Sequence, residues 1–310
     1  KAAEVLVDML ENSIFEKTEL DRERKVICEE IKMTKDAPDD LAHDTFVSNM
    51  FKGSNLGHSI LGTPSSLSRI THNVMKEYVE KQYTRDSIVV SVSGNFDCDD
   101  VCDYFENKFQ KLKAKKEAFK WKNYKYSPFT KSQVKDIQQA HICLGTKGPT
   151  LQDEKFYDFQ VLNNILGGSM SSRLFQNIRE QKGLAYSVYT YLTRFENCGL
   201  LSVYVGTTKE DYKEVIKLVK EEFKNIKENG ISERELRKAK NKYESAFTFS
   251  LESTSSRMNR LASTYITYGK IISLDKVRED IEKVTLKDIK KAAEFLFDEQ
   301  FYSQTIVGDI

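Results

Sequence analysis

Two stretches of the chain share one pattern of hydrophobic and polar positions. Residues 67–96 and 281–310 each begin with apolar residues at the three- and four-residue spacing of an amphipathic helix, and each ends in a short apolar run. Thr71 and Thr285 stand just before the helical stretches, where a hydroxyl can cap the first turn. In both stretches the pattern predicts a helix, then a strand that ends at a Gly-Asn or Gly-Asp turn.

The two stretches align residue by residue at a constant offset. With an offset of 214 positions, Ile70 falls on Val284, Tyr83 on Phe297, Val92 on Ile306 and Gly94 on Gly308. A second match, Glu19-Leu20 with Glu235-Leu236, lies one element earlier at an offset of 216. Two matches in the same order indicate tandem copies of one unit. The alternative is a chance similarity, because helix-then-strand segments are common.

The two copies begin differently. About a hundred residues of the second copy precede Glu235, whereas 18 residues precede Glu19 in the first. If the copies are equivalent, the first lacks roughly 80 residues at its N-terminus. The chain also opens inside an amphipathic helix that has Leu6, Met9 and Leu10 on one face. We therefore expect a truncated chain.

The second copy mixes strands with helices. The segments QQAHICLGTKG, AYSVYTYLTRF and GLLSVYVGT have the pattern of strands, and DEKFYDFQVLNNILGG and SSRLFQNIREQKG have that of helices. This mixture predicts the α+β class, with two homologous domains that are each a mostly antiparallel sheet packed with helices. We expect the truncated first domain at 1–112, a linker at 113–131 and the second domain at 132–310.

The Lys-rich segment 111–129 and the overall charge bear on possible partners. We interpret this segment as a solvated linker whose aromatic residues pack against the domains; the alternative is a basic strip for single-stranded nucleic acid. The chain has 48 basic and 47 acidic residues, a net charge of +1. This balance favours the linker and argues against nucleic acid or an anionic membrane as the main partner. No apolar run approaches the roughly 18 residues of a membrane span.

Two glutamates share the apolar face of a helix predicted in DRERKVICEEIKM. Glu23, Val26, Ile27 and Glu30 fall at i, i+3, i+4 and i+7, which is one face of a helix. Because a buried carboxylate is costly without a cation or a donor, we expect both carboxylates to be partly buried and partnered. The alternative is that this face lies at a domain edge and both carboxylates reach water.

The arrangement of these glutamates resembles a known family. The pattern R-E-x-x-x-x-x-x-E, opening a helix shortly before DAPDDLAHD, is similar to that of the insulinase/pitrilysin zinc peptidases, in particular their mitochondrial-processing-peptidase-like branch with its bacterial relatives. In that family the second glutamate completes a zinc site begun by an upstream H-x-x-E-H helix, and the first supports it. The resemblance implies zinc (Zn) as the cofactor, Glu30 as a metal ligand and Glu23 as a supporting catalytic residue.

The resemblance extends over essentially the whole chain and is most specific in IREQKGLAYSV. There Arg179 and Tyr186 resemble an Arg/Tyr pair of the family's second domain, which reaches the substrate at the zinc. We expect Arg179 near a helix end and Tyr186 at the start of a strand, on either side of a turn at Gly183. The resemblance implies catalytic roles for both; the alternatives are a surface charge and a packed aromatic. Residues 167–169 are either a substrate-contacting loop or a helix C-cap.

The sequence departs from the family at the metal site. None of its four histidines belongs to an H-x-x-E-H motif. A catalytic zinc takes three protein ligands and a water, so two ligands are missing from these residues. We expect the motif in the missing N-terminal stretch. We interpret His43 and His58 as solvated or capping groups, because their spacing fits no single helix face.

The second copy lacks the two glutamates as well. At an offset of 216, Ala239 and Ala246 replace Glu23 and Glu30. The segment GSMSSRLF stands where the family's first domain has its H-x-x-E-H. Residues 132–310 are therefore predicted to form a metal-free domain, and residues 1–112 the C-terminal portion of the metal-site domain.

The resemblance predicts that the intact protein is a zinc-dependent endopeptidase that acts on extended or unfolded peptides. We expect this chain alone to be inactive. The alternative is a non-catalytic peptide-binding or scaffolding subunit. The resemblance also implies a homodimer, or a heterodimer with a related subunit. Five scattered cysteines are typical of reduced thiols, so we expect the bacterial cytoplasm, with the mitochondrial matrix as the alternative.

Overall fold

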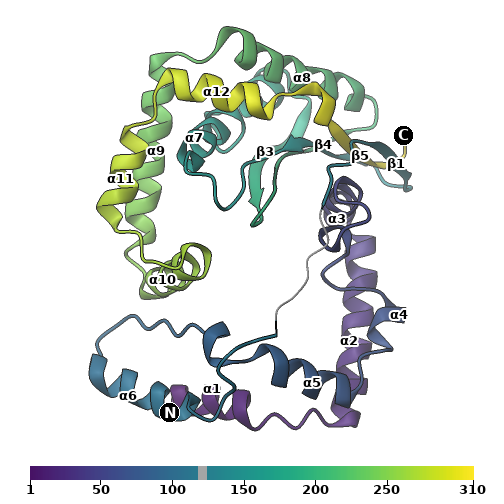
Figure 1. Ribbon diagram of the computed structural model, residues 1–310. Coiled ribbons are helices and arrows are strands. Elements are labelled where there is room, and N and C mark those ends of the chain that lie inside the picture. Colours follow the sequence, from purple (N-terminus) through teal and green to yellow (C-terminus); the bar gives the residue numbers. More distant parts are fainter. Residues whose placement is uncertain (118–123) are drawn as a thin grey trace.

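A computed structural model describes residues 1–117 and 124–310 of the chain. Residues 118–123, in the middle of the predicted linker, lie outside this described part. We call residues 1–112 the first unit and residues 132–310 the second unit. Figure 1 shows the first unit mainly in the lower part of the view and the second unit, which contains the sheet, in the upper part.

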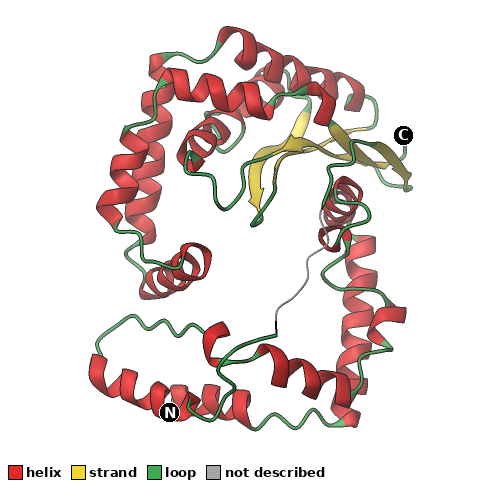
Figure 2. Ribbon diagram, viewed as in Figure 1, coloured by secondary structure: helices red, strands yellow, loops and turns green. Residues whose placement is uncertain are grey.

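The first unit consists of helices and turns (Figure 2). Thr71 caps the helix predicted in the first repeat by accepting a hydrogen bond from the backbone N–H of Val74. The helices and helical turns are α1 (Ala2–Glu11), α2 (Lys17–Asp36), α3 (Pro38–Met50), η1 (Asn55–Gly57), α4 (Pro64–Leu67), α5 (His72–Gln82), η2 (Arg85–Ser87) and α6 (Cys98–Phe109).

The second unit is built on a five-stranded sheet in the order β1-β5-β2-β4-β3. All neighbouring strands are antiparallel except β1 and β5, which are parallel. The strands are β1 (Thr130–Val134), β2 (Gln139–Lys147), β3 (Ala185–Arg194), β4 (Gly199–Thr208) and β5 (Ser303–Gly308). The α+β class and the mostly antiparallel sheet are confirmed for this unit.

Helices pack against one face of this sheet and enclose the main core. Leu162, Phe223 and Phe297 are fully buried there, and the rings of Phe223 and Phe297 stack with centroids 4.5 Å apart. The helices of the second unit are α7 (Phe156–Leu166), the π-helix η3 (Phe175–Gln181), α8 (Tyr212–Asn229), α9 (Glu233–Ser250), α10 (Thr254–Tyr268), α11 (Leu274–Glu282), α12 (Leu286–Leu296) and the 3₁₀ turn η4 (Glu299–Phe301).

The opposite face of the sheet is covered by a helix of the first unit. Ala42, Phe46 and Met50 of α3 are fully buried in a second core, together with Cys143 and Leu200 of the sheet. Gly145 makes this packing possible, because a Cβ there would lie 2.8 Å from Cζ of Phe46. Helix α3 therefore joins the two units (Figure 1).

The aromatic residues that follow the undescribed part of the linker extend this second core. Tyr124, Tyr126 and Phe129 pack against it, and Tyr126 donates a hydrogen bond to the carbonyl oxygen of Gly199 at 2.8 Å. This agrees with the predicted packing of linker aromatics against the domains. Strand β1 begins at Thr130, one position before the predicted end of the linker at residue 131.

The helix boundaries agree with the internal duplication. Helix α9 begins 216 positions after α2, and α12 begins and ends 214 positions after α5. Thr285 caps α12 as Thr71 caps α5, and each helix has an aromatic C-cap, Phe297 and Tyr83 respectively. Equivalent helices thus recur in the same order in both units.

The prediction of a strand in the first repeat is wrong. Residues 89–94, which correspond to β5, form no strand, and Val89, Val90 and Val92 are each 37–43% exposed. A strand needs a neighbour for its backbone hydrogen bonds, and no described segment supplies one. In the second unit, β1 and β2 pair with β5 on its two sides.

Helices α3 and α10 are also equivalent, but only α3 is covered. Helix α10 begins 216 positions after α3 and has no buried residue. Its Met258, Tyr265 and Ile266 are 36%, 48% and 70% exposed. The carbonyl oxygen of Met258 accepts a hydrogen bond from Ser91 Oγ at 2.9 Å, so α10 lies beside the segment that corresponds to β5.

The burial of Phe46 predicts a large cost for its removal. Phe46→Ala should lower the free energy of unfolding by about 3–5 kcal/mol, because it leaves a cavity between α3 and the sheet. Met33→Ala is the control, since Met33 on α2 is 70% exposed. Urea denaturation checks both variants, and equal stability of the two would contradict the packing of α3.

Candidate functional site

Glu23 and Glu30 both lie on the exposed surface of α2. The expectation that they are partly buried is wrong, and Val26 on the same face is 50% exposed. The reason is that no described residue packs over this face. Across residues 1–117 and 124–310, neither carboxylate has a hydrogen-bond or ion-pair partner, whereas the neighbouring Glu29 is 2.7 Å from Lys32 Nζ.

The described residues by themselves do not fit a catalytic zinc. Such a site takes three protein ligands. In the described part of the chain, no group of three His, Cys, Asp or Glu side chains is arranged to hold a metal ion. Glu30 alone would leave a catalytic zinc ion two protein ligands short.

Arg179 and Tyr186 lie where the sequence predicts them. Arg179 is near the end of the π-helix η3, and Tyr186 is the second residue of β3. The turn between them contains Gly183 with φ = 67°, a left-handed conformation that glycine adopts without strain. Irregular π-helical turns are frequent at functional sites.

Both side chains point to solvent and are available to a ligand. Tyr186 is 63% exposed. Arg179 is exposed, with its guanidinium carbon 4.9 Å from the centre of the Phe175 ring. Within the described part of the chain, no hydrogen bond or ion pair joins either residue to Glu23 or Glu30. The structure thus brings Arg179 and Tyr186 to one turn and places the glutamates separately, on α2.

The segment 167–169 begins as a helix cap. Gly167 is the C-cap of α7, and its backbone N–H bonds the carbonyl oxygen of Asn163 at 3.1 Å. A Cβ at Gly167 would lie 2.4 Å from Thr190 Cγ2, so the close approach to β3 requires glycine. The C-cap alternative for this segment is therefore confirmed.

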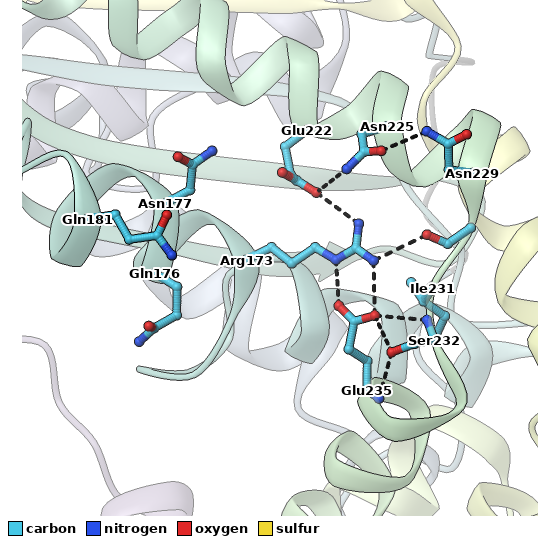
Figure 3. Close-up of a pocket in the computed structure, with 11 residues that line it drawn as sticks. Arg173, Gln176, Asn177, Gln181, Glu222, Asn225, Asn229, Ile231, Ser232 and Glu235 are labelled. Carbon is cyan, nitrogen blue, oxygen red and sulfur yellow. Dashed lines mark hydrogen bonds and ion pairs between the residues drawn. The ribbon is translucent and has the colours of Figure 1, made fainter.

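In the second unit an ion-pair cluster stands at the start of α9, where Glu235 lies one turn before Ala239, the equivalent of Glu23. Figure 3 shows Arg173 between Glu222 and Glu235, at the edge of a cavity of about 700 Å³. The guanidinium donates to both Glu235 carboxylate oxygens at 2.6 and 3.0 Å and to Glu222 at 3.0 Å. Ala239, the equivalent of Glu23, is buried in the main core. This arrangement satisfies the local charges without a metal.

Glu235 is held in its charged form by these contacts. Burial alone would raise the pKa of Glu235, but the hydrogen bonds from Arg173 and Ser232 outweigh burial and lower it to about 2. Ser232 and Glu235 also form the capping box of α9. The Arg173–Glu235 pair therefore fixes the start of α9 against the segment that leads into η3.

The interpretation of His43 as solvated or capping is wrong. His43 on α3 is half-buried and lies against the sheet. Its Nδ1 is 2.6 Å from the Tyr191 hydroxyl and its Nε2 is 3.2 Å from the Tyr189 hydroxyl. Its ring also stacks on Tyr204, with centroids 5.0 Å apart. His58, in contrast, is exposed and is the C-cap of η1, as expected.

The aromatic and histidine groups around His43 form one network. We call His43, His141, Tyr189, Tyr191 and Tyr204 the junction cluster. His141 Nδ1 is 2.8 Å from the Tyr204 hydroxyl. Burial lowers the pKa of both histidines and raises that of the three tyrosines, so all five are neutral near pH 7.

The spacing of residues in α3 and β3 indicates which of their faces carry the members of this cluster. His43, Phe46 and Met50 lie at i, i+3 and i+7, which places His43 on the buried face of α3. Tyr189 and Tyr191 alternate along β3 and so share one face of the sheet. Spacing within each element could not show that these two faces meet.

Two family profiles match the sequence. The profile described as Insulinase (Peptidase family M16) matches residues 1–64. The profile described as Peptidase M16 inactive domain matches residues 69–243, which is more than half of the chain. In the described residues, no helix is both long and apolar enough to cross a membrane.

Similar curated proteins come from bacteria. The sequence is 38% identical over 300 residues to the uncharacterized zinc protease YmxG of Bacillus subtilis, covering 97% of this chain and 73% of that protein. It is 33% identical over 300 residues to the uncharacterized zinc protease SCO5738 of Streptomyces coelicolor, covering 94% of this chain and 65% of that protein.

Solved structures share the fold. A crystal structure described as a peptidase M16 inactive domain from Pseudomonas fluorescens superposes with a TM-score of 0.91 at 19% identity, covering 100% of this chain and 74% of that one. A protease from Helicobacter pylori gives a TM-score of 0.83 at 19% identity, covering 94% of this chain and 72% of that one. At this identity the likeness is evidence of fold alone.

The lowered pKa of Glu235 predicts a pH-dependent contribution to stability. The ordinary pKa is 4.5 and the folded value is about 2, so the stabilisation is complete above pH 4.5 and is lost as the pH falls toward 2. Glu235→Gln should lower the free energy of unfolding at pH 7 by about 1–2 kcal/mol, a value reduced for the side chain's partial exposure.

This prediction is checked by urea denaturation at several pH values. The difference between Glu235→Gln and wild type should shrink as the pH falls below 4.5. Glu233→Gln, an exposed neighbour in the same helical turn, is the control. A difference that stays constant down to pH 2 would contradict the ion-pair account.

Proposed function

The chain belongs to the insulinase family of peptidases, peptidase family M16, and on this premise we propose that the protein is a zinc-dependent endopeptidase acting on extended or unfolded peptides. Its relatives in Bacillus and Streptomyces carry the name zinc protease. The proposal assigns to Glu30 the role of metal ligand and to Glu23 that of its supporting carboxylate. Arg179 and Tyr186 are assigned contacts to the substrate.

One observation carries this proposal: the equivalent helices of the two units differ at these positions. Helix α2 has Glu23 and Glu30, whereas α9 has Ala239 and Ala246. Since α9 forms a regular helix with alanines, the helix itself does not require carboxylates there. Neither glutamate has a partner among the described residues, so neither carboxylate stabilises α2 through a described contact, which favours a role in chemistry.

The metal would need ligands from beyond these 310 residues. Because the sequence has no H-x-x-E-H, we propose that a longer form of the protein supplies both histidines and that this chain alone is inactive. Zinc would supply Lewis-acid activation of the scissile carbonyl and of a water.

The uncovered surfaces of the first unit support this proposal. In the second unit, α12 and β5 are largely buried in a complete layer of sheet and helices. They are the equivalents of α5 and of residues 89–94. In the first unit Tyr78 is 58% and Val90 is 43% exposed. We propose that the remainder of the metal-site domain covers α5, α10 and residues 88–94.

Arg179 and Tyr186 are suited to hold a peptide rather than a metal. A guanidinium and a phenol both donate hydrogen bonds, and donors directed at a developing oxyanion lower a reaction barrier by a few kcal/mol. Tyr186 lies on β3, which is an edge strand of the sheet. We propose that an extended substrate lies along a sheet edge, since backbone pairing there favours unfolded segments over folded proteins.

A non-catalytic subunit is the second candidate. The match of residues 69–243 to an inactive-domain profile favours it. We nevertheless favour the peptidase, because a scaffold has no need of Glu30 and Tyr186. We further propose that the protein pairs with itself or with a related subunit, and that it works in the bacterial cytoplasm.

The role of Glu30 is tested in the full-length protein. Glu30→Gln should abolish zinc binding and peptide cleavage, because an amide replaces the anionic ligand. Glu23→Gln should lower the zinc affinity or the rate of cleavage by about 10–100-fold, as is usual for a group that supports a metal ligand. Glu29→Gln is the matched control on the same exposed turn. Zinc content by mass spectrometry and cleavage of an unfolded peptide are the measurements; unchanged zinc and cleavage in Glu30→Gln would rule out the assignment.

The proposed roles of Tyr186 and Arg179 predict a loss of catalytic rate without a loss of zinc. Tyr186→Phe and Arg179→Ala should each lower kcat by about 10²–10³-fold while the zinc content stays at the wild-type level. Lys182→Ala is the control, because Lys182 is an exposed residue of the turn that separates Arg179 from Tyr186. Steady-state kinetics on an unfolded peptide decide the matter. Full activity of both variants would remove these residues from the site.

A further inference from the structure

Helix α3 controls the direction of the helix that carries Glu30. Helix α2 ends at Asp36 and α3 begins at Pro38, so Ala37 is the only residue between them. The backbone N–H of Ala37 bonds Met33 of α2, and the Ala37 carbonyl accepts from Leu41 of α3. The orientation of α2 therefore follows that of α3.

The apolar contacts of α3 do not by themselves fix its orientation. Phe46 and Met50 are fully buried against the sheet. The burial of apolar area is nondirectional, so the buried area alone does not select one orientation of the helix, although close packing of Phe46 over Gly145 limits sliding. Hydrogen bonds depend steeply on distance and angle. The groups that make directional contacts therefore determine the exact placement of the helix.

His43 makes two such contacts across this interface. Its two ring nitrogens face the hydroxyls of Tyr191 and Tyr189, at 2.6 and 3.2 Å. A neutral imidazole has one donor and one acceptor nitrogen, and a phenol can serve either, so both contacts can be satisfied together. Stacking of the ring on Tyr204 further restricts its plane. Asn259 is the equivalent of His43 on α10, which is not covered.

The partners of His43 belong to the strand that carries Tyr186. Tyr189 and Tyr191 lie three and five positions after Tyr186 on β3. Arg179 precedes the same strand across the Gly183 turn. The His43 contacts thus connect the helix pair that carries Glu30 directly to the strand that carries Tyr186.

We propose that His43 is a positioning residue that sets the placement of α2 relative to β3. This inference rests on the proposed function in one respect, namely that Glu30 and Tyr186 act on one substrate. The directional contacts to Tyr189 and Tyr191 fix α3, α3 fixes α2, and the separation of Glu30 from Tyr186 follows. Loss of these contacts leaves α3 held by its apolar face and, at its C-terminal end, by the hydrogen bond from the Ser127 backbone N–H to the Met50 carbonyl oxygen at 2.9 Å, while the end nearer α2 becomes freer to move.

The geometric part of the inference is tested on this chain without any activity. Spin labels attached to a non-natural amino acid at positions 29 and 182, both exposed, report the distance between α2 and the turn before β3. A non-natural attachment site avoids labelling the five native cysteines. Pulsed electron–electron double resonance should give one narrow distribution of the distance between the two labels in the wild type.

Four variants separate positioning from general packing. His43→Leu keeps an apolar side chain but loses both contacts, and Tyr191→Phe removes only one hydroxyl; both should broaden or shift the distribution. His43→Asn retains a polar group near Nδ1 and should restore part of the wild-type width. His58→Leu is the control, because His58 is exposed. If His43→Leu fails to fold, the distance distribution of Tyr191→Phe alone tests the inference. A wild-type distance distribution in every one of these two variants that folds would overturn the inference.

Kinetics of the zinc-loaded full-length protein complete the test. Tyr191→Phe should lower kcat by about 10–100-fold, the effect of a misplacement near 1 Å, with zinc content and KM unchanged. A shifted distance together with an inactive wild type would disprove the proposed function but leave the positioning role intact. A shifted distance with unchanged kcat would disprove the link between His43 and the reaction.

Discussion

The seating of α3 on the second unit's sheet is the contact on which the rest of the structure depends. Phe46 enters the space that Gly145 leaves open, and Met50 lies beside it in a fully buried cluster. This contact buries several apolar side chains between the units. By comparison, the contact between Ser91 and Met258 is a single hydrogen bond. Because only Ala37 separates α2 from α3, the same contact keeps the helix that carries Glu23 and Glu30 attached to the second unit.

The duplication explains why one arrangement of helices carries different side chains at equivalent positions. The two units share equivalent helices in the same order, and their start positions differ by nearly constant offsets. In the second unit Ala239 is buried and Arg173 pairs with Glu235, so the local charges are satisfied internally. In the first unit the equivalent positions carry carboxylates that have no partner among residues 1–117 and 124–310. A duplicated scaffold can thus satisfy its charges internally in one copy and leave the equivalent positions of the other copy open to solvent.

Local sequence patterns predicted the elements that are determined locally. The caps at Thr71 and Thr285, the turn at Gly183 and the position of Tyr186 at the start of a strand all follow from short-range rules of helix capping and glycine conformation. The α+β class of the second unit followed from the same patterns. The roles of Glu23, Glu30, Arg179 and Tyr186 came from family resemblance, and they stay predictions.

Features that depend on distant pairing could not be predicted in this way. The run at 88–93 has the composition of a strand, but a strand forms only when another segment lies beside it. Exposure of Glu23 depends on what covers α2, and the spacing of α2 carries no information about that. The meeting of His43 with Tyr189 and Tyr191 joins residues nearly 150 positions apart. Each of these outcomes is decided by tertiary contacts.

The proposed zinc site takes one ligand, Glu30, from this chain and its histidines from elsewhere in a longer form of the protein. Native mass spectrometry in the presence of zinc tests it most directly, because it counts bound ions on an intact chain. The account predicts no retained zinc on the 310-residue chain and one zinc on a full-length form that contains an H-x-x-E-H. Stoichiometric zinc on the 310-residue chain alone, or none on the full-length form, would contradict it.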